Sequence, residues 1–304
     1  MVFSGIIVPL VTPFSKDLRV DVEATKWLVQ HLIKGGVHGI FPNSTTGEFP
    51  HLRVDEVLLL VKSVVEVVKD SVKVIPGITY NYTYDSIELG KKLIDLGVDG
   101  FIIAPPYYFK LDSEKLKRHF ASIAESLDKP IIIYNIPETT GINIPLDVYL
   151  ALVKEYSNVV GTKITSSDFT YLRRVVSEVK VLRRDFKVLT GLDELILPAL
   201  IIGCDGGVLG LANIVPRLYV ELYESWVKGD ITNAIRLYKK VVTLSKIYDM
   251  SSSIPSGVKA VLNALGTPIK PYVRPPLTTE PKDKVEAMVK IVKELGVKHV
   301  GEAI

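Results

Sequence analysis

One stretch of the chain, residues 130–168, decides the predicted fold: PIIIYNIPETTGINIPLDVYLALVKEYSNVVGTKITSSD. It holds two apolar runs, Ile131-Ile132-Ile133 and Val159-Val160-Gly161, and a reactive side chain follows each run closely: Tyr134 and Lys163. Such runs are typical of strands buried on both faces, as in a parallel sheet covered by helices, although a buried helical segment has the same pattern. If both strands line one interior, a phenol and an amine meet at its mouth.

Similar runs recur along the chain, separated by helical patterns. The expected strands are 6–11, 39–42, 72–78, 100–104, 130–134, 159–163, 187–192 and 207–211. The expected helices are one capped by Asp21 and those at 54–68, 85–96, 112–127, 146–156, 169–179, 194–202 and 216–227. This alternation predicts an α/β protein, a closed parallel (β/α)8 TIM barrel rather than an open doubly wound sheet. No glycine fingerprint for a dinucleotide follows the first strand.

After Gly229 the pattern contains helices only, at 231–248, 256–265 and 282–295, with a proline-rich link at 268–276. We therefore expect a catalytic barrel over residues 1–228 and a helical extension over residues 229–304 that packs on it.

Composition excludes several classes of partner. The 304 residues are 47% hydrophobic and carry a net charge of +3, from 37 basic and 34 acidic side chains spread along the chain. Neither nucleic acid nor a membrane surface is expected as a partner. The single cysteine, Cys204, lies in an apolar run and is interpreted as an inert core thiol. Residues 1–14 lack the pattern of a signal peptide and no apolar span is long enough for a bilayer, so a cytoplasmic location is expected.

In such barrels the active site lies at the carboxyl ends of the strands. Lys163 lies at one such end, and burial disfavours the charged form of a lysine side chain and lowers its pKa. A neutral amine attacks ketones and forms a protonated imine that draws electrons from the adjacent carbon. That chemistry makes or breaks carbon–carbon bonds without a metal. Alternatively, Lys163 extends past the strand into solvent.

Other strand ends carry polar side chains. Tyr134 moves protons if a hydrogen-bond chain holds its phenol, for example with Thr45; otherwise it is a barrel-end aromatic. The turn Thr45-Thr46-Gly47 suits a carboxylate, or is only a turn. Asp193 and Glu194 accept hydrogen bonds from substrate hydroxyls, or stabilise the start of a helix. The histidines are scattered without ligand spacing, so no metal site is indicated: His31, His38, His51, His119 and His299.

Together, four motifs resemble the dihydrodipicolinate synthase and N-acetylneuraminate lyase family of Schiff-base aldolases. They are Ser44-Thr45-Thr46-Gly47-Glu48, Tyr134-Asn135-Ile136-Pro137, Gly161-Thr162-Lys163 and Arg274-Pro275-Pro276. The resemblance runs from about Gly5 to Leu277 and implies a barrel with C-terminal helices, a homotetramer and no cofactor.

The resemblance also implies roles for individual residues. Lys163 would form the imine with pyruvate or another 2-keto acid, and Tyr134 would be the proton shuttle. Thr45 and Thr46 would hold the carboxylate of the keto acid. Gly191 and Val208 would lie near the bound imine, and Tyr108 would match the loop tyrosine of the family.

The aldehyde partner is predicted from three places. The synthase branch carries an arginine, which binds the carboxylate of the aldehyde, where this chain has Thr139. Without the guanidinium of that arginine, the carboxylate of the aldehyde has no charged partner. The segment 191–194 and Thr165, two residues after Lys163, resemble the lyase pattern that binds sugar hydroxyls. We therefore expect cleavage of a 2-keto-3-deoxy sugar acid, such as 2-keto-3-deoxygluconate, to pyruvate and a hydroxyaldehyde.

Four other hypotheses stay open. The first is dihydrodipicolinate synthesis from pyruvate and aspartate semialdehyde, and the second is a dehydratase of the same family. The third is a binding barrel that has lost the chemistry; such a protein would lose Lys163, Tyr134 or Thr45 first, and all three are present. The fourth, a phosphate-binding enzyme, would use the glycines near the last strand, but no basic cluster accompanies them: Gly203, Gly206, Gly207 and Gly210.

Overall fold

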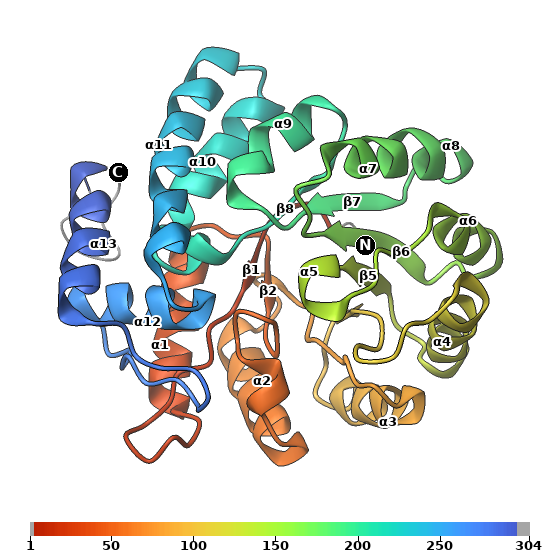
Figure 1. Cartoon of the computed structure of the whole chain (residues 1–304), viewed down its shortest axis with the longest axis horizontal. Coiled ribbons are helices and arrows are strands. Elements are labelled where there is room, and N and C mark those ends of the chain that lie inside the picture. Colours follow the sequence, from red (N-terminus) through yellow and green to blue (C-terminus); the bar gives the residue numbers. More distant parts are fainter. Residues whose placement is uncertain (1–2, 297–304) are drawn as a thin grey trace. The chain divides into compact units, whose positions relative to one another are not determined.

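The computed structural model describes residues 3–296, and its contacts divide the chain into two compact units. Ile75–Val208 form most of the first unit, and the second joins Gly5–Val74 to the described residues from Leu209 onward. Eight strands and their helices alternate along the chain in the predicted order (Figure 1). The predicted division at residues 228 and 229 stays a prediction. His299 and the end of the predicted extension, residues 297–304, lie outside the described residues.

The first unit contains five parallel strands that pair in chain order. They are β4 (Phe101–Ile103), β5 (Ile131–Asn135), β6 (Val159–Ile164), β7 (Lys187–Thr190) and β8 (Gly206–Val208). The apolar run of β5 is fully buried and pairs residue by residue with β4. Strands of this kind bury apolar side chains on both faces, so helices have to cover them.

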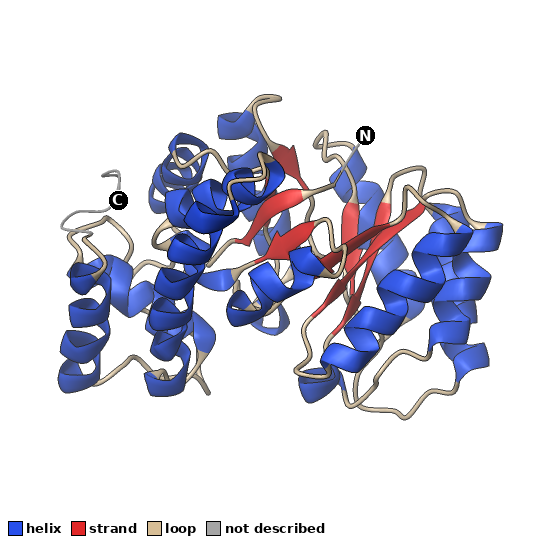
Figure 2. Ribbon diagram, turned by 90° about the horizontal axis from the view of Figure 1, so that it is seen from above, coloured by secondary structure: helices blue, strands red, loops and turns tan. Residues whose placement is uncertain are grey.

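Helices alternate with the strands of the first unit along the chain, and α4 packs between α3 and α6 (Figure 1). Figure 2 shows helices along the strands in a second view. Its helices are α3 (Thr83–Ile94), α4 (Ser113–Ser126), α5 (Pro137–Thr140), α6 (Leu146–Glu155), α7 (Phe169–Arg174), α8 (Lys180–Leu182) and α9 (Ile196–Ile201). Asp112 caps α4 by accepting a hydrogen bond from the backbone N–H of Lys115 at 2.9 Å. A cap of this kind satisfies a backbone donor that has no partner within the helix.

The second unit begins with three parallel strands, β1 (Gly5–Pro9), β2 (Gly39–Phe41) and β3 (Lys73–Val74). The helices α1 (Val22–Lys34) and α2 (Val54–Val68) connect them and pack on each other. Asp21 caps α1 as predicted, since its carboxylate accepts from the backbone N–H of Ala24 at 3.0 Å.

The rest of the second unit is helical. Its helices are α10 (Pro216–Val227), α11 (Ile231–Met250), α12 (Ile254–Ala264) and α13 (Lys282–Glu294). The helix α11 packs against α10, α12 and α13. The predicted helices at 54–68 and 216–227 are confirmed to the residue.

Several predicted elements differ from the structure in their bounds, and for three of them the structure shows how. The strand predicted at 207–211 ends at Val208, because Gly210–Asn213 form a 3-10 turn closed by the Asn213 side chain, which donates to the Gly210 carbonyl oxygen at 2.8 Å. The helix predicted at 169–179 changes to π geometry over Val175–Val179. The strand predicted at 72–78 is continuous over Lys73–Val74 only, since Pro76 has no N–H to donate to a ladder, and beyond it a single parallel bridge joins Gly77 to Ile102.

Within residues 3–296, no helix is both long and apolar enough to cross a membrane.

Candidate active site

Lys163 and Tyr134 lie side by side in the interior of the first unit. Their strands β5 and β6 are neighbours, and the two residues are partners in the register. Each side chain is about 4% exposed, and the Nζ atom of Lys163 lies 3.9 Å from the centroid of the Tyr134 ring. The structure therefore excludes the alternative in which Lys163 extends into solvent. A phenol and an amine share one buried position, as the apolar runs of their strands predict.

Thr165 and Gly191 complete the surroundings of this pair. The Thr165 hydroxyl donates to the Tyr134 hydroxyl at 3.3 Å, so the partner of the phenol in this unit is Thr165. A Cβ atom at Gly191 would lie 1.9 Å from the Thr165 hydroxyl and 2.9 Å from Cε of Lys163. Both distances are below van der Waals contact, so only glycine fits at position 191 with these side chains in place. The structure thus places Gly191 beside Lys163, where the resemblance expects it.

The other predicted residues of the first unit differ in exposure. Val208 and Asp193 are buried, whereas Glu194 and Thr139 are exposed. Thr139 lies in the short helix α5, directly after β5. Tyr108 is 88% exposed and its ring packs edge to face on Phe109, with centroids 5.2 Å apart. Tyr108 therefore does not share the buried position of Lys163 within this unit.

The predicted turn Thr45-Thr46-Gly47 belongs to the second unit and follows β2. The backbone N–H of Gly47 donates to the Ser44 hydroxyl at 3.0 Å, so it closes the turn. A Cβ atom at Gly47 would lie 2.6 Å from the Leu10 carbonyl oxygen, which explains the glycine. Thr45 is half-buried and Thr46 is buried. The two threonine hydroxyls are the groups of this turn best suited to a carboxylate.

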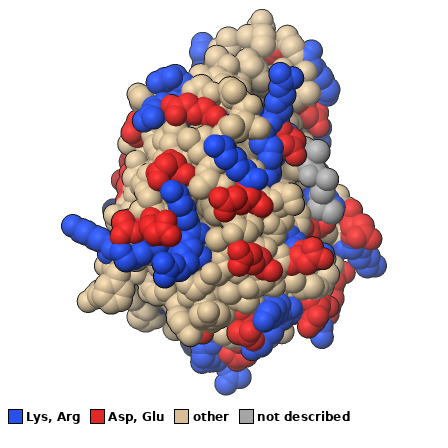
Figure 3. Space-filling view, turned by 90° about the vertical axis from the view of Figure 1, so that its right-hand side faces the viewer, with Lys and Arg blue, Asp and Glu red and all other residues tan. Residues whose placement is uncertain are grey.

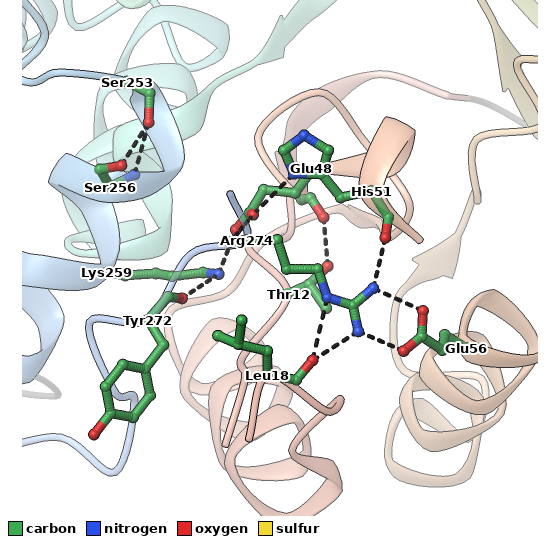
Figure 4. A network of polar contacts seen from close by, with 11 residues as sticks. Thr12, Leu18, Glu48, His51, Glu56, Ser253, Ser256, Lys259, Tyr272 and Arg274 are labelled. Atoms are coloured by element: carbon green, nitrogen blue, oxygen red, sulfur yellow. Dashed lines mark hydrogen bonds and ion pairs between the residues drawn. The ribbon is translucent and has the colours of Figure 1, made fainter. Parts of the chain in front are cut away.

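Glu48, the next residue, is held by contacts that the sequence does not predict (Figure 4). Its backbone is left-handed, with φ at 60°, a conformation that costs a side-chain-bearing residue on the order of 1 kcal/mol. Its carboxylate accepts from the Nζ atom of Lys259 at 2.6 Å and from the backbone N–H of Arg274 at 2.9 Å. The motifs that contain Glu48 and Arg274 pointed to this region, but no local signal identified Lys259.

Arg274 links the same loop to α2 (Figure 4). Its guanidinium donates to both carboxylate oxygens of Glu56, at 2.7 Å for the Nη1 to Oε2 contact. It also donates to the carbonyl oxygen of Leu18 at 2.7 Å and lies 4.6 Å from the centroid of the Phe14 ring. The hydrogen bonds from Arg274 lower the pKa of the Glu56 carboxyl to about 2. A guanidinium and a carboxylate joined by two hydrogen bonds hold each other in one geometry.

Potential metal ligands are dispersed over residues 3–296, and charges of both signs mix on the face that is drawn. Basic and acidic side chains are interspersed on the face drawn in Figure 3. Across the described ranges, no three His, Cys, Asp or Glu side chains gather in a group suited to a metal ion. Burial raises the pKa of the Cys204 thiol to about 12, which agrees with its interpretation as an inert core residue.

Comparison with known proteins assigns the class of enzyme. The model of the dihydrodipicolinate synthetase family matches residues 2–295. A protein of Thermofilum pendens named as an uncharacterized DapA-like lyase is 50% identical over 296 residues, which cover 97% of this chain and 98% of that protein. The 4-hydroxy-tetrahydrodipicolinate synthase of Methanopyrus kandleri is 37% identical and covers 96% of both chains. The chain belongs to the dihydrodipicolinate synthetase family.

Two further comparisons extend this result. The probable 2-dehydro-3-deoxy-D-pentonate aldolase YjhH of Escherichia coli is 32% identical, over 94% of this chain and 96% of that protein. The crystal structure of YagE from E. coli K12, a member of the same family in complex with pyruvate, has a TM-score of 0.94 at 28% identity and covers 97% of this chain and 99% of that one. The predicted (β/α)8 barrel with C-terminal helices is confirmed, and the chain is an enzyme of a family of lyases and aldolases.

Proposed function

We propose that the chain is a class I aldolase that reversibly cleaves a 2-keto-3-deoxy sugar acid, such as 2-keto-3-deoxygluconate, to pyruvate and a hydroxyaldehyde. The observation that carries this proposal is the buried contact of Lys163 with Tyr134, at 3.9 Å from Nζ to the ring centroid. An amine that attacks a carbonyl and a phenol that moves protons are the two groups this reaction needs.

The reaction begins with imine formation. The Nζ atom of Lys163 attacks the C2 carbonyl carbon of the keto acid, and the resulting carbinolamine loses water to give a protonated imine. The hydroxyls of Thr45 and Thr46 bind the carboxylate of the keto acid, and Gly191 and Val208 border the imine. The absence of a side chain at Gly191 supports this role, because a Cβ atom there would lie 2.9 Å from Cε of Lys163.

Bond cleavage follows from the charge on the imine. The phenol of Tyr134 relays the proton of the C4 hydroxyl, which later returns to C3, and the C3–C4 bond breaks. Its electron pair moves into the imine and gives an enamine, while C4 leaves as the aldehyde. The enamine takes a proton at C3, and water hydrolyses the imine to pyruvate and the free amine of Lys163. The resemblance also assigns Tyr108 a part in this proton transfer as the loop tyrosine of the family, although its exposed ring does not lie beside Lys163 within the first unit.

The choice of a sugar acid rests on the groups around α5 and β7. The only charged side chain of α5 is Glu138, and the exposed Thr139 offers a hydroxyl instead of a guanidinium. An anionic aldehyde therefore meets no cation in α5, whereas Thr165, Asp193 and Glu194 offer partners for hydroxyl groups. The similarity to the pentonate aldolase supports the same choice.

Dihydrodipicolinate synthesis is the second candidate, supported by the 37% identity with a 4-hydroxy-tetrahydrodipicolinate synthase. Two measurements test the proposal. Borohydride reduction in the presence of pyruvate, followed by peptide mapping, is expected to modify Lys163, and absence of that modification excludes both candidates and leaves the non-catalytic barrel. Steady-state rates are expected to favour glyceraldehyde over aspartate semialdehyde, and the opposite preference selects the synthase. Loss of water from a sugar acid without cleavage selects a dehydratase.

We also propose that the protein works as a homotetramer without a cofactor, in the cytoplasm. Large aromatic side chains exposed on the first unit support self-association, since monomers rarely expose such groups together: Tyr82, Tyr84, Tyr108 and Phe109. Native mass spectrometry tests the assembly, and a monomer at micromolar concentration contradicts it.

A further inference from the structure

We propose that Lys259 is a positioning residue for the substrate carboxylate, acting through Glu48 on the turn that contains Thr45 and Thr46. This inference rests on the proposed function of that turn. Lys259 lies on α12, 211 positions from Glu48 in the sequence, and its Nζ atom lies 2.6 Å from Oε1 of Glu48 (Figure 4). Both side chains are 0% exposed.

The contacts of Lys259 leave it little freedom. Its Nζ atom also donates to the Tyr272 carbonyl oxygen at 3.0 Å and lies 4.2 Å from the centroid of the Phe14 ring. The second oxygen of Glu48 accepts from the backbone N–H of Arg274 and lies 3.4 Å from Nδ1 of His51. Burial lowers the pKa of Lys259 to about 8, while the carboxylate of Glu48 opposes that shift, so the ammonium form prevails at neutral pH.

The position of Glu48 sets the turn before it. The backbone N–H of Glu48 donates to the Thr45 carbonyl oxygen at 3.1 Å, and the Gly47 carbonyl oxygen accepts from the Thr12 hydroxyl at 2.6 Å. Glu48 adopts its left-handed backbone while both its carboxylate oxygens are occupied. If the ammonium of Lys259 is removed, one oxygen of a buried carboxylate loses its partner, and the segment rearranges toward water. The threonines then leave the geometry that binds a carboxylate.

A role in stability alone does not account for this pair. Replacing a buried ion pair with apolar side chains is often neutral or stabilising, because removing the two charges from water is costly. A fully buried lysine and glutamate, joined across the chain and aligned by the Tyr272 carbonyl oxygen and the Arg274 backbone N–H, instead hold one conformation against others. The conformation that they hold is that of the loop after β2.

The test compares two ketones as reagents for the imine lysine in the intact protein. Pyruvate has a carboxylate and hydroxyacetone has none, so only pyruvate depends on the turn. The variant Lys259→Met is expected to raise the pyruvate concentration that gives half-maximal borohydride labelling of Lys163 by about tenfold, the effect of losing one hydrogen bond to a charged group. Half-maximal labelling with hydroxyacetone is expected to stay within about twofold, which is the error range for an independent site.

Controls separate positioning from general damage. Lys228→Met removes a lysine from the surface pair with Glu224 in the same unit, where the lysine side chain is 71% exposed. This variant is expected to leave the half-maximal labelling concentration unchanged for both ketones. Glu48→Gln is expected to reproduce the selective loss for pyruvate, and it serves alone if Lys259→Met does not fold. When Lys259→Met is added to Glu48→Gln, the half-maximal pyruvate concentration is expected to rise by less than about twofold, because Lys259 acts through Glu48.

Each outcome decides the inference. If Lys259→Met raises the half-maximal labelling concentration equally for both ketones, or for neither, the positioning role is overturned while the imine chemistry stays intact. Full additivity of the two substitutions overturns the route through Glu48. If the unmodified protein is labelled by neither ketone, the proposed function fails and the inference fails with it.

Discussion

Tyr134 and Lys163 are register partners on neighbouring strands only because β6 contains one extra residue. Ile131 pairs with Val159 but Ile132 pairs with Gly161, so Val160 has no partner in β5. Without this shift Tyr134 would pair with Thr162, whose side chain points to the opposite face from Lys163. Bulges of this kind redirect side chains, and here the bulge brings the phenol to the side of the amine.

Replacing Lys163 with alanine is expected to lower aldol cleavage by at least about a thousandfold, because the proposed reaction proceeds through an imine at Lys163. Borohydride labelling with pyruvate is expected to disappear in the same variant. Lys154→Ala, an exposed lysine on α6 of the same unit, provides the matched control and should retain both activities. Turnover by Lys163→Ala at the unmodified rate would contradict the proposal.

Replacing Tyr134 with phenylalanine is expected to separate the two chemical steps. The variant keeps the ring beside Lys163 but lacks the phenol oxygen, so kcat should fall by about a hundredfold or more, while the imine still forms. Labelling and steady-state rates measured on one preparation give both quantities. Tyr156→Phe removes a hydroxyl that contacts Glu125 on the surface and should change neither.

Introducing a side chain at Gly191 is expected to disturb the site by contact alone. In Gly191→Ala the new Cβ atom would lie 1.9 Å from the Thr165 hydroxyl, so Thr165 and Lys163 have to move. Displacements of about 1 Å cost roughly a hundredfold in rate. Adding Thr165→Ala removes the nearest clash, and the double variant should recover part of the labelling by pyruvate. No recovery would indicate that the contact with Lys163 dominates.

An arginine at position 139 is expected to shift the preference between aldehydes. Thr139→Arg places a guanidinium in α5, which should raise the rate with aspartate semialdehyde relative to glyceraldehyde by about tenfold, as one charge-assisted contact provides. Thr170→Arg adds the same charge at an exposed position of α7 in the same unit and should leave the ratio unchanged. Equal ratios for the two variants would remove α5 from the determinants of specificity.

The pairing of Glu56 with Arg274 predicts resistance to acid. Because hydrogen bonds from Arg274 lower the pKa of Glu56 from 4.5 to about 2, the folded state favours the carboxylate more than the unfolded state does. The stability gained is fully present above about pH 4.5 and is lost as the pH falls toward 2. Arg274→Gln should therefore unfold at a higher pH, as followed by circular dichroism. Arg217→Gln, which removes an exposed pair with Glu221, should not.

The strands and most helices follow from local patterns in the sequence. The buried run Ile131-Ile132-Ile133 defines β5, and the spacing of apolar residues in 54–68 defines α2, because both signals lie within one element. The sequence does not predict the bulge at Val160. An apolar residue within an apolar run gives the same pattern whether or not it has a partner in the next strand.

The residues of the candidate site also differ in whether the sequence predicts them. Lys163 and Tyr134 were predictable because each follows an apolar run at the end of a strand. Lys259 was not, because its surroundings in α12 resemble those of any helical lysine until the fold places Glu48 beside it. Ion pairs between distant segments depend on tertiary packing, which a single sequence does not show.

The distance in sequence between Lys259 and Glu48 has a consequence during translation. A ribosome releases the loop after β2 long before it adds α12 and Arg274, so the nascent chain carries Glu48 without the two donors that later bind its carboxylate. The loop therefore reaches its final form only after Lys259 and Arg274 have left the exit tunnel. A product of premature termination before Lys259 would contain Lys163 and Tyr134 and still lack a settled loop after β2.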